Sequence, residues 1–318
     1  MRGDDERRLL SWRRGRALAL LAVTVACLLA FHAVVPNGIG RAGSLLETFL
    51  PWLGLTVPVL TALALLRRSA VALTAMVLPA VAWLSVFGGL LLPGDRSAHD
   101  VIALQHNVSD ENPDPAGTAR ELIKARADLI ALEEVTPSAL PAYGAVLAPE
   151  YPHRATTGTV GLWSKYPLTD VRPLDIKPRG ISEGWNRGLR ATARTPHGDV
   201  AVHVAHLPSV RLGLRSGFAS AWRDESAALL GRAVEAEPLD KVILLGDLNS
   251  TVDDRGLAPV SSQLQTADSG FAFSWPAGFP LARIDQIMAR SATVTGVWSL
   301  PATGSDHLPI AAHISFTR

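Results

Sequence analysis

Residues 242–249 read VILLGDLN. The first four of these residues are apolar and predict a short buried strand. Asp247 and Asn249 follow directly, where that strand should end. A sheet can hold the side chains at its strand ends rigidly over a cleft, as ligand sites in α/β folds show. An Asp-x-Asn pair there can orient a water molecule with one side chain and hold a phosphate oxygen with the other.

Other apolar runs of the chain also end in polar side chains. Each polar residue has an ordinary explanation when it is taken alone, such as a turn, a helix cap or the start of a loop. With residues 247–249 they make five such ends, and so many in one chain are much less expected by chance, which favours one shared site. The residues at the other ends are Asn107, Glu134, His206 and the pair Asp306 and His307.

The types of these residues fit metal-assisted chemistry on a phosphate. Amide and carboxylate oxygens suit a hard cation, so we expect Mg²⁺, with Mn²⁺ or Ca²⁺ as alternatives. Such a cation on a phosphoryl oxygen neutralises charge that develops in the transition state. Histidine beside aspartate can move protons near neutral pH. Zinc is disfavoured, because Cys27 is the single cysteine and no HExxH motif is present.

Residues 100–318 alternate between short apolar runs and helical patterns, which predicts an α/β domain with sheet layers flanked by helices. Helices are expected at residues 117–127 and 222–236. No internal repeat or low-complexity tract interrupts the pattern. Strands are expected at residues 101–104, 128–132, 159–163, 189–195, 200–205, 242–245, 281–288 and 310–316.

Six short motifs in this region resemble those of the endonuclease/exonuclease/phosphatase superfamily. Together they span nearly all of residues 100–318. The resemblance implies a four-layer α/β sandwich that hydrolyses phosphate esters. The motifs are LQHN at 104–107, IALEEV at 130–135, HVAHL at 203–207, GDLN at 246–249, RIDQI at 283–287 and SDHLP at 305–309.

The resemblance implies that Asn107 and Glu134 bind the metal, with Asp306 contributing to or supporting that site. One position departs from the family pattern, because Glu133 stands where the family usually has glutamine. Alternation along a strand should point Glu133 and Glu134 to opposite faces, so one carboxylate ligand is expected rather than two.

The resemblance also implies the catalytic set, in which Asp247 positions or activates the attacking water. Asp285 would orient His307, and His206 would be the second catalytic histidine.

Two further residues would contact the substrate phosphate. Asn249 takes this role from the Gly-Asp-Leu-Asn motif. Arg187 matches a family position that approaches the phosphate, with Arg190 as its competitor.

The first hundred residues are predicted to form a membrane anchor. Residues 17–35, 48–66 and 70–92 contain no charged side chain, and each run is long enough to cross a bilayer core of about 30 Å as a helix. A cleaved signal peptide before a greasy soluble domain is the alternative. Residues 1–16 hold six arginines, which predicts a cytoplasmic N-terminus. After three spans and a linker at 93–99, the catalytic domain at 100–318 would then lie outside the cytoplasm.

The anchor and the charge distribution bear on the substrate. From Asp100 onward there are 20 basic and 24 acidic residues, which disfavours sequence-independent nucleic-acid binding. Tethering raises the local enzyme concentration around a lipid-linked phosphate, so such a substrate is expected. An anchored nuclease and a non-catalytic envelope binding module are the alternatives, and no protein partner is predicted.

The combination of three spans with this domain is similar to actinobacterial membrane proteins associated with teicoplanin resistance. The resemblance implies action in the cell envelope on undecaprenyl pyrophosphate.

Overall fold

The computed structural model describes residues 15–92, 94, 99–213 and 215–317. It contains two compact units, which divide between Leu91 and Leu92. Most of the expected basic N-terminus and of the linker at 93–99 lies outside the described residues. Each unit is therefore considered by itself.

The first unit consists of helices, and these differ from the three expected spans. By length and apolar composition, one helix among the described residues could cross a membrane, Ala70–Phe87, or two if a bent pair counts as one span. That pair, Ala42–Thr48 and Leu50–Leu66, bends by 69° just before Pro51, which lacks the N–H of a continuous helix. The helix Arg16–Ala30 is shorter than a span, so three spans are not confirmed. The elements are α2 (Arg16–Ala30), η1 (His32–Val34), α3 (Ala42–Thr48), η2 (Leu50–Leu55), α4 (Thr56–Leu66), α5 (Ala70–Ala75), α6 (Val77–Phe87) and η3 (Gly89–Leu91).

The second unit is built on two sheets. The strands of the first are β1 (Val101–Asn107), β2 (Leu129–Glu133), β3 (His153–Thr157), β4 (Val160–Ser164), β12 (Ala292–Ser299) and β13 (Ile310–Phe316). The strands of the second are β5 (Leu168–Pro173), β6 (Gly188–Thr195), β7 (Gly198–Ala205), β10 (Val242–Asp247) and β11 (Asp285–Arg290). Their orders are β12-β13-β1-β2-β4-β3 and β11-β10-β7-β6-β5. A small hairpin pairs β8 (Leu212–Gly213) with β9 (Gly217–Phe218).

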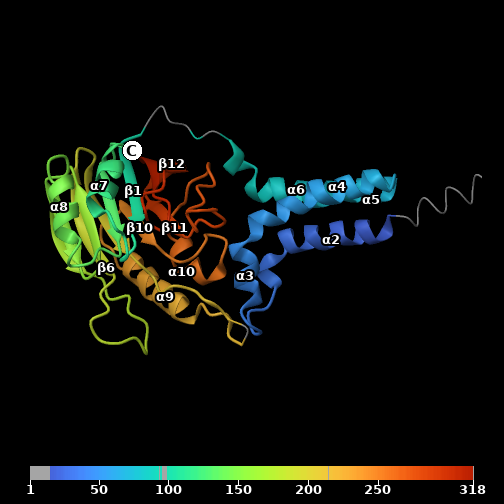
Figure 1. The fold of residues 1–318 in the computed structure, drawn as a ribbon, viewed down its shortest axis with the longest axis horizontal. Helices are drawn as coiled ribbons and strands as arrows, with labels where there is room; N and C mark the ends of the chain where they lie inside the picture. Colours follow the sequence, from blue (N-terminus) through green and yellow to red (C-terminus); the bar gives the residue numbers. More distant parts are fainter. Residues whose placement is uncertain (1–14, 93, 95–98, 214, 318) are drawn as a thin grey trace, which may run out of the picture. The chain divides into compact units, whose positions relative to one another are not determined.

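Helices cover the outer face of each sheet (Figure 1). Along β10, Ile243 and Leu245 pack between the two sheets, whereas Leu244 packs against Leu230 of a helix. This is the period of two expected for a strand buried on both faces. The resulting layers are helix, sheet, sheet and helix, a mixed α/β fold. The helices are α7 (Pro115–Ile123), α8 (Leu140–Leu147), α9 (Ala221–Glu235), η4 (Arg255–Leu257) and α10 (Ala258–Ser261).

The strand pairing brings the polar strand ends together. In the first sheet β1 and β2 are parallel, with Asn107 opposite Glu133. In the second sheet β10 pairs with β11, with Asp247 opposite Asp285. Because the two sheets pack face to face, each contributes side chains to one site at the ends of β1, β2 and β10.

Candidate active site

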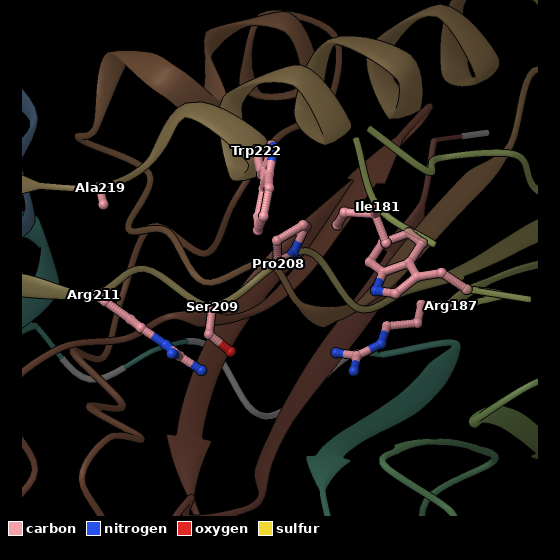
Figure 2. A pocket seen from close by; sticks show the side chains of 8 residues that line it. Ile181, Arg187, Pro208, Ser209, Arg211, Ala219 and Trp222 are labelled. Carbon is pink, nitrogen blue, oxygen red and sulfur yellow. The ribbon is translucent and has the colours of Figure 1, made fainter. Parts of the chain in front are cut away.

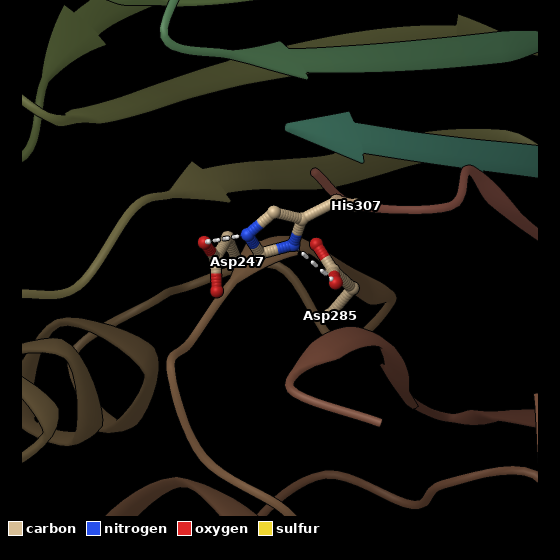
Figure 3. A group of neighbouring side chains, drawn as sticks. All are labelled: Asp247, Asp285 and His307. Atoms are coloured by element: carbon tan, nitrogen blue, oxygen red, sulfur yellow. Dashed lines mark hydrogen bonds and ion pairs between the residues drawn. The ribbon is translucent and has the colours of Figure 1, made fainter. Parts of the chain in front are cut away.

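A buried aspartate and histidine form the best-defined pair of the site. His307 donates from Nδ1 to Asp285 Oδ2 over 2.8 Å (Figure 3). Gln105 donates from Nε2 to the other carboxylate oxygen, Oδ1, over 3.0 Å. Burial alone would lower the pKa of His307, but the charges of Asp285 and Asp247 raise it to about 10. Burial would raise the pKa of Asp285, but the His307 charge holds it below its usual value. The pair is therefore an ion pair at neutral pH.

Asp247 lies at the centre of the site. Its Oδ2 accepts a hydrogen bond from Asn107 Nδ2 over 3.0 Å and lies 3.7 Å from both His307 Nε2 and His206 Nε2. Its Oδ1 accepts from the backbone N–H of Asn249 over 2.9 Å. Burial raises the pKa of Asp247 to about 7. A carboxylate with such a pKa is suited to take a proton from water near neutral pH.

Steric crowding explains why residue 246, directly before Asp247, is glycine. At Gly246 a Cβ atom would lie 1.9 Å from the backbone oxygen of Ala205 on the neighbouring strand. Any side chain here would push β10 away from β7. Gly246 therefore lets the chain that carries Asp247 lie close against the end of β7.

Asn107 and Glu134 present side-chain oxygens near Asp247. Asn107 is buried, and its Oδ1 accepts from the backbone N–H of Ser109 over 3.1 Å. Glu134 is partly exposed; its Oε2 accepts from the backbone N–H of Asp110 over 3.2 Å, and its Oε1 lies 3.8 Å from His206 Nε2. An amide oxygen and a carboxylate next to a site for phosphate are the donors that Mg²⁺ uses. The residues present therefore fit a hard divalent cation.

Asp306 stands apart from these two ligands. It is exposed, and among the described residues its carboxylate makes no hydrogen bond or ion pair with Asn107 or Glu134. Its charge contributes to the raised pKa of His307. The structure thus places Asp306 at the rim near His307, and a role as metal ligand stays a prediction.

The two neighbouring glutamates do not follow simple strand alternation. The strand β2 ends at Glu133, and Glu134 has a left-handed backbone with φ of 59°. Glu133 is fully buried and accepts from Gln105 Nε2 over 2.7 Å. Burial, with the charges of Asp285 and Asp247, raises the pKa of Glu133 well above its usual value. Burial therefore favours the uncharged form of Glu133 beneath the site, which leaves Glu134 as the candidate carboxylate ligand.

The structure places the two candidate arginines in different surroundings. Arg187 donates from its NH1 group to the ring of His206, at 3.2 Å from Nδ1 and 3.3 Å from Nε2. Arg190 is buried and forms an ion pair with Glu237 at 2.8 Å on the outer face of the second sheet. Arg187 therefore belongs to the site and Arg190 does not. Burial and the Arg187 charge lower the pKa of His206 well below its usual value.

Asn249 lies beside Asp247, but its amide is engaged within the loop. Its backbone is left-handed with φ of 48°, and its Nδ2 donates to the backbone oxygen of Leu207 over 3.0 Å. Within the part of the chain that the structure describes, the second amide hydrogen of Asn249 meets no acceptor and so is available for a phosphate oxygen. Arg223 of α9, which sequence reasoning missed, donates to the backbone oxygen of Asn249 over 3.0 Å and to Asp254 over 2.6 Å. In the sequence, the only sign of this role of Arg223 is that an arginine lies within a predicted amphipathic helix.

Asp247, Asp285 and His307 form a second arrangement that could hold a metal ion, with ligand atoms within 4.8 Å of one another (Figure 3). A cation here would face the charged ring of His307 and would have to break its 2.8 Å hydrogen bond to Asp285. These three residues are better suited to moving protons. Asn107 and Glu134 are better suited to the metal.

The chain resembles several solved structures. A mannosyl-6-phosphatase of Bacteroides thetaiotaomicron matches with a TM-score of 0.55 and 17% identity, over 68% of this chain and 100% of that one. Sphingomyelinase C of Streptomyces griseocarneus matches with a TM-score of 0.51 and 20% identity, over 70% and 99%. A beta toxin mutant of Staphylococcus aureus with bound magnesium ions matches with a TM-score of 0.50 and 17% identity, over 67% and 99%. At these identities the likeness shows the fold alone.

No curated protein sequence matches the chain significantly. The family model described as "Endonuclease/Exonuclease/phosphatase family" matches residues 104–307. That range begins and ends within the motifs that build the site, and it covers well over half of the chain. The chain belongs to the endonuclease/exonuclease/phosphatase family.

Proposed function

We propose that the protein is a Mg²⁺-dependent hydrolase of phosphoric esters or anhydrides. The observation that carries this proposal is the position of Asp247, whose Oδ2 lies 3.0 Å from Asn107 and 3.7 Å from the rings of His206 and His307. Mg²⁺ held by Asn107 and Glu134 would neutralise charge on the reacting phosphoryl group. The magnesium ions in the beta toxin mutant support this choice of cation.

Each side chain of the site has a separate role in the proposed hydrolysis. Asp247 accepts a proton from the attacking water, which its raised pKa favours. His307, kept charged by Asp285, donates a hydrogen bond from Nε2 to a phosphoryl oxygen. Arg187 and the free amide hydrogen of Asn249 hold the other phosphate oxygens. Burial and the Arg187 charge disfavour the charged form of His206, so its ring can accept from Arg187 and keep that guanidinium at the site.

The location and substrate follow from the first unit, which we propose to be a multi-pass membrane anchor of three spans. Its helices expose many large apolar side chains, which a water-soluble domain rarely does. With the arginines of residues 1–16 in the cytoplasm, the catalytic unit would lie outside it. A lipid-linked phosphate such as undecaprenyl pyrophosphate is then the proposed substrate, in the manner of the teicoplanin-resistance proteins. The exposed side chains include Leu20, Leu21, Val59, Leu65, Val77, Leu78, Val81 and Leu84.

The proposal is tested on detergent-purified full-length protein with undecaprenyl pyrophosphate, sphingomyelin and plasmid DNA. Each substrate is assayed with Mg²⁺, Mn²⁺, Ca²⁺ or EDTA. We expect Mg²⁺-dependent phosphate release from the lipid diphosphate, its loss in Asp247→Asn, and full activity in the exposed control Asp199→Asn. Cleavage of DNA without turnover of either lipid would favour the nuclease instead. Absence of hydrolysis on all substrates would contradict an enzymatic role.

The topology is tested separately by a reporter fused after Arg318. An alkaline phosphatase reporter, which is active only outside the cytoplasm, should be active, and a fluorescent protein that matures in the cytoplasm should be dark. The reverse pattern would contradict the proposed orientation.

A further inference from the structure

A pocket opens next to Arg187. Its volume is about 320 Å³, within the range of small-molecule pockets, which begins near 300 Å³. In Figure 2 the guanidinium groups of Arg187 and Arg211 lie on either side of Ser209, and Trp222 stands above Pro208. Of its lining residues, only Arg187 takes part in the chemistry proposed at Asp247.

The walls of the pocket are held in place by hydrogen bonds. Ser226 of α9 donates to the backbone oxygen of Ile176 over 2.6 Å, which ties the segment leading to Arg187 against α9. On the other wall, the backbone N–H of Ala219 donates to the backbone oxygen of Arg211 over 3.0 Å, beside the β8–β9 hairpin. The pocket is therefore a built feature of the fold.

The charge of the pocket selects an anion. Two of the eight lining residues are arginines and none is acidic. Among the described residues, neither Arg187 nor Arg211 forms an ion pair with a carboxylate. Arginine is suited to phosphate because its planar group donates two parallel hydrogen bonds. Since Arg187 also contacts His206, an anion held between the two arginines would lie one group away from the reacting phosphate.

The aromatic side chains of the pocket indicate that the bound anion is attached to an apolar group. Trp222 is 54% exposed and lines the pocket mouth. Trp185 lies under the guanidinium of Arg187, with 5.4 Å between Cζ and the ring centroid, a distance typical of a cation–π contact. Trp185 thus orients Arg187, whereas Trp222 is left with an apolar face for a ligand.

We infer that this pocket binds the leaving group of a lipid diphosphate, with the inner phosphate between Arg187 and Arg211 and the start of the apolar chain against Trp222. The inference rests on the proposed hydrolase function and deepens it. Water attacks the terminal phosphorus, the bond from that phosphorus to the bridging oxygen breaks, and the lipid monophosphate leaves with its charge beside Arg211. Inorganic phosphate is the other product.

The test compares a polyprenyl diphosphate with the matching polyprenyl monophosphate as substrates of the full-length protein. In Arg211→Ala the ratio of kcat/KM for the diphosphate to that for the monophosphate should fall about tenfold or more, as for loss of a charged hydrogen bond. Arg215→Ala removes an exposed charge from the same hairpin without lining the pocket and should leave the ratio within about twofold. An unchanged ratio in Arg211→Ala would overturn the inference.

The aromatic contact is tested by chain length. Trp222→Ala should raise KM for the polyprenyl diphosphate but not for inorganic pyrophosphate, and Trp222→Phe should restore it. Equal effects on both substrates would overturn the role of Trp222. A preference for nucleoside diphosphates over polyprenyl diphosphates would also overturn it.

A binding measurement separates this inference from the proposed function. Calorimetry with inorganic pyrophosphate and the inactive Asp247→Asn protein should show binding that weakens about tenfold when Arg211→Ala is added. If the natural protein hydrolyses none of the substrates, the proposed function fails, but this measurement still shows whether the pocket binds a diphosphate. If hydrolysis occurs but Arg211→Ala leaves the affinity for pyrophosphate unchanged, only the inference about the pocket fails.

Discussion

Replacing Asp247 with asparagine should abolish activity and at the same time make the metal-free protein more stable. The carboxylate is buried, and its pKa of about 7 lies roughly three units above the ordinary value of 3.8. The folded protein therefore binds an extra proton between about pH 4 and pH 7, and its stability falls as the pH rises through this window. At about 1.4 kcal/mol per unit, the charged carboxylate costs about 4 kcal/mol at pH 8.

The asparagine removes this cost but introduces a smaller one. Its oxygen can still accept from the backbone N–H of Asn249, whereas its NH₂ group faces the Nδ2 donor of Asn107. Opposed donors cost about 1 to 3 kcal/mol. The net gain at pH 8 is therefore about 1 to 3 kcal/mol, or about 2 to 10 °C in Tm for a unit of this size. Loss of a general base should lower kcat by about 10²- to 10⁴-fold.

The assay is thermal unfolding in EDTA at pH 8 and at pH 4.5, beside a phosphate-release assay in Mg²⁺. The gain in Tm should be present at pH 8 and should shrink toward pH 4.5, where Asp247 is protonated in the folded protein. The exposed variant Asp199→Asn should change neither Tm nor activity. An Asp247→Asn protein that is less stable than the natural one at pH 8 would refute the electrostatic reasoning.

Three other changes test the neighbours of Asp247. Asp285→Asn should lower kcat about 10- to 100-fold, and the alkaline limb of the pH–rate profile should move to lower pH because His307 loses the charge that raises its pKa; an unmoved limb would contradict this role. Glu134→Gln should raise the Mg²⁺ concentration for half-maximal rate about tenfold or more, with an unchanged requirement as the contrary result. Arg223→Met should lower the free energy of unfolding by about 3 to 5 kcal/mol, since it leaves buried Asp254 unpaired; the double variant Arg223→Met/Asp254→Leu should recover most of it in chemical denaturation.

The strand ends were the part of the site that the sequence predicts best. Each short apolar run forms a strand that is buried on both faces. A polar residue directly after it is therefore expected to lie in the cleft at the end of the strand. Asn107, Glu134, His206 and Asp247 follow this rule, and their strands meet because β1 and β2, like β7 and β10, are parallel neighbours.

Local sequence patterns could not predict features that depend on contacts between residues far apart in the chain. Arg190 competed with Arg187 in the sequence, and only their partners far along the chain, His206 for Arg187 and buried Glu237 for Arg190, separate them. The left-handed backbone at Glu134 breaks the alternation that local pattern implies. The strand β5 was missed because it is mostly exposed and ends in Pro173, so it lacks an apolar run. The bend before Pro51 lies at the start of one expected span, so residues 42–48 extend that helix at an angle the sequence did not predict.

Anomalous diffraction from crystals of the protein soaked in Mn²⁺ would locate the metal ion of the site. We expect one strong peak within bonding distance of Asn107 Oδ1 and the Glu134 carboxylate, with the His307–Asp285 hydrogen bond intact. A peak enclosed by Asp247, Asp285 and His307 instead, or no bound ion near any of these side chains, would contradict this assignment of the metal ligands.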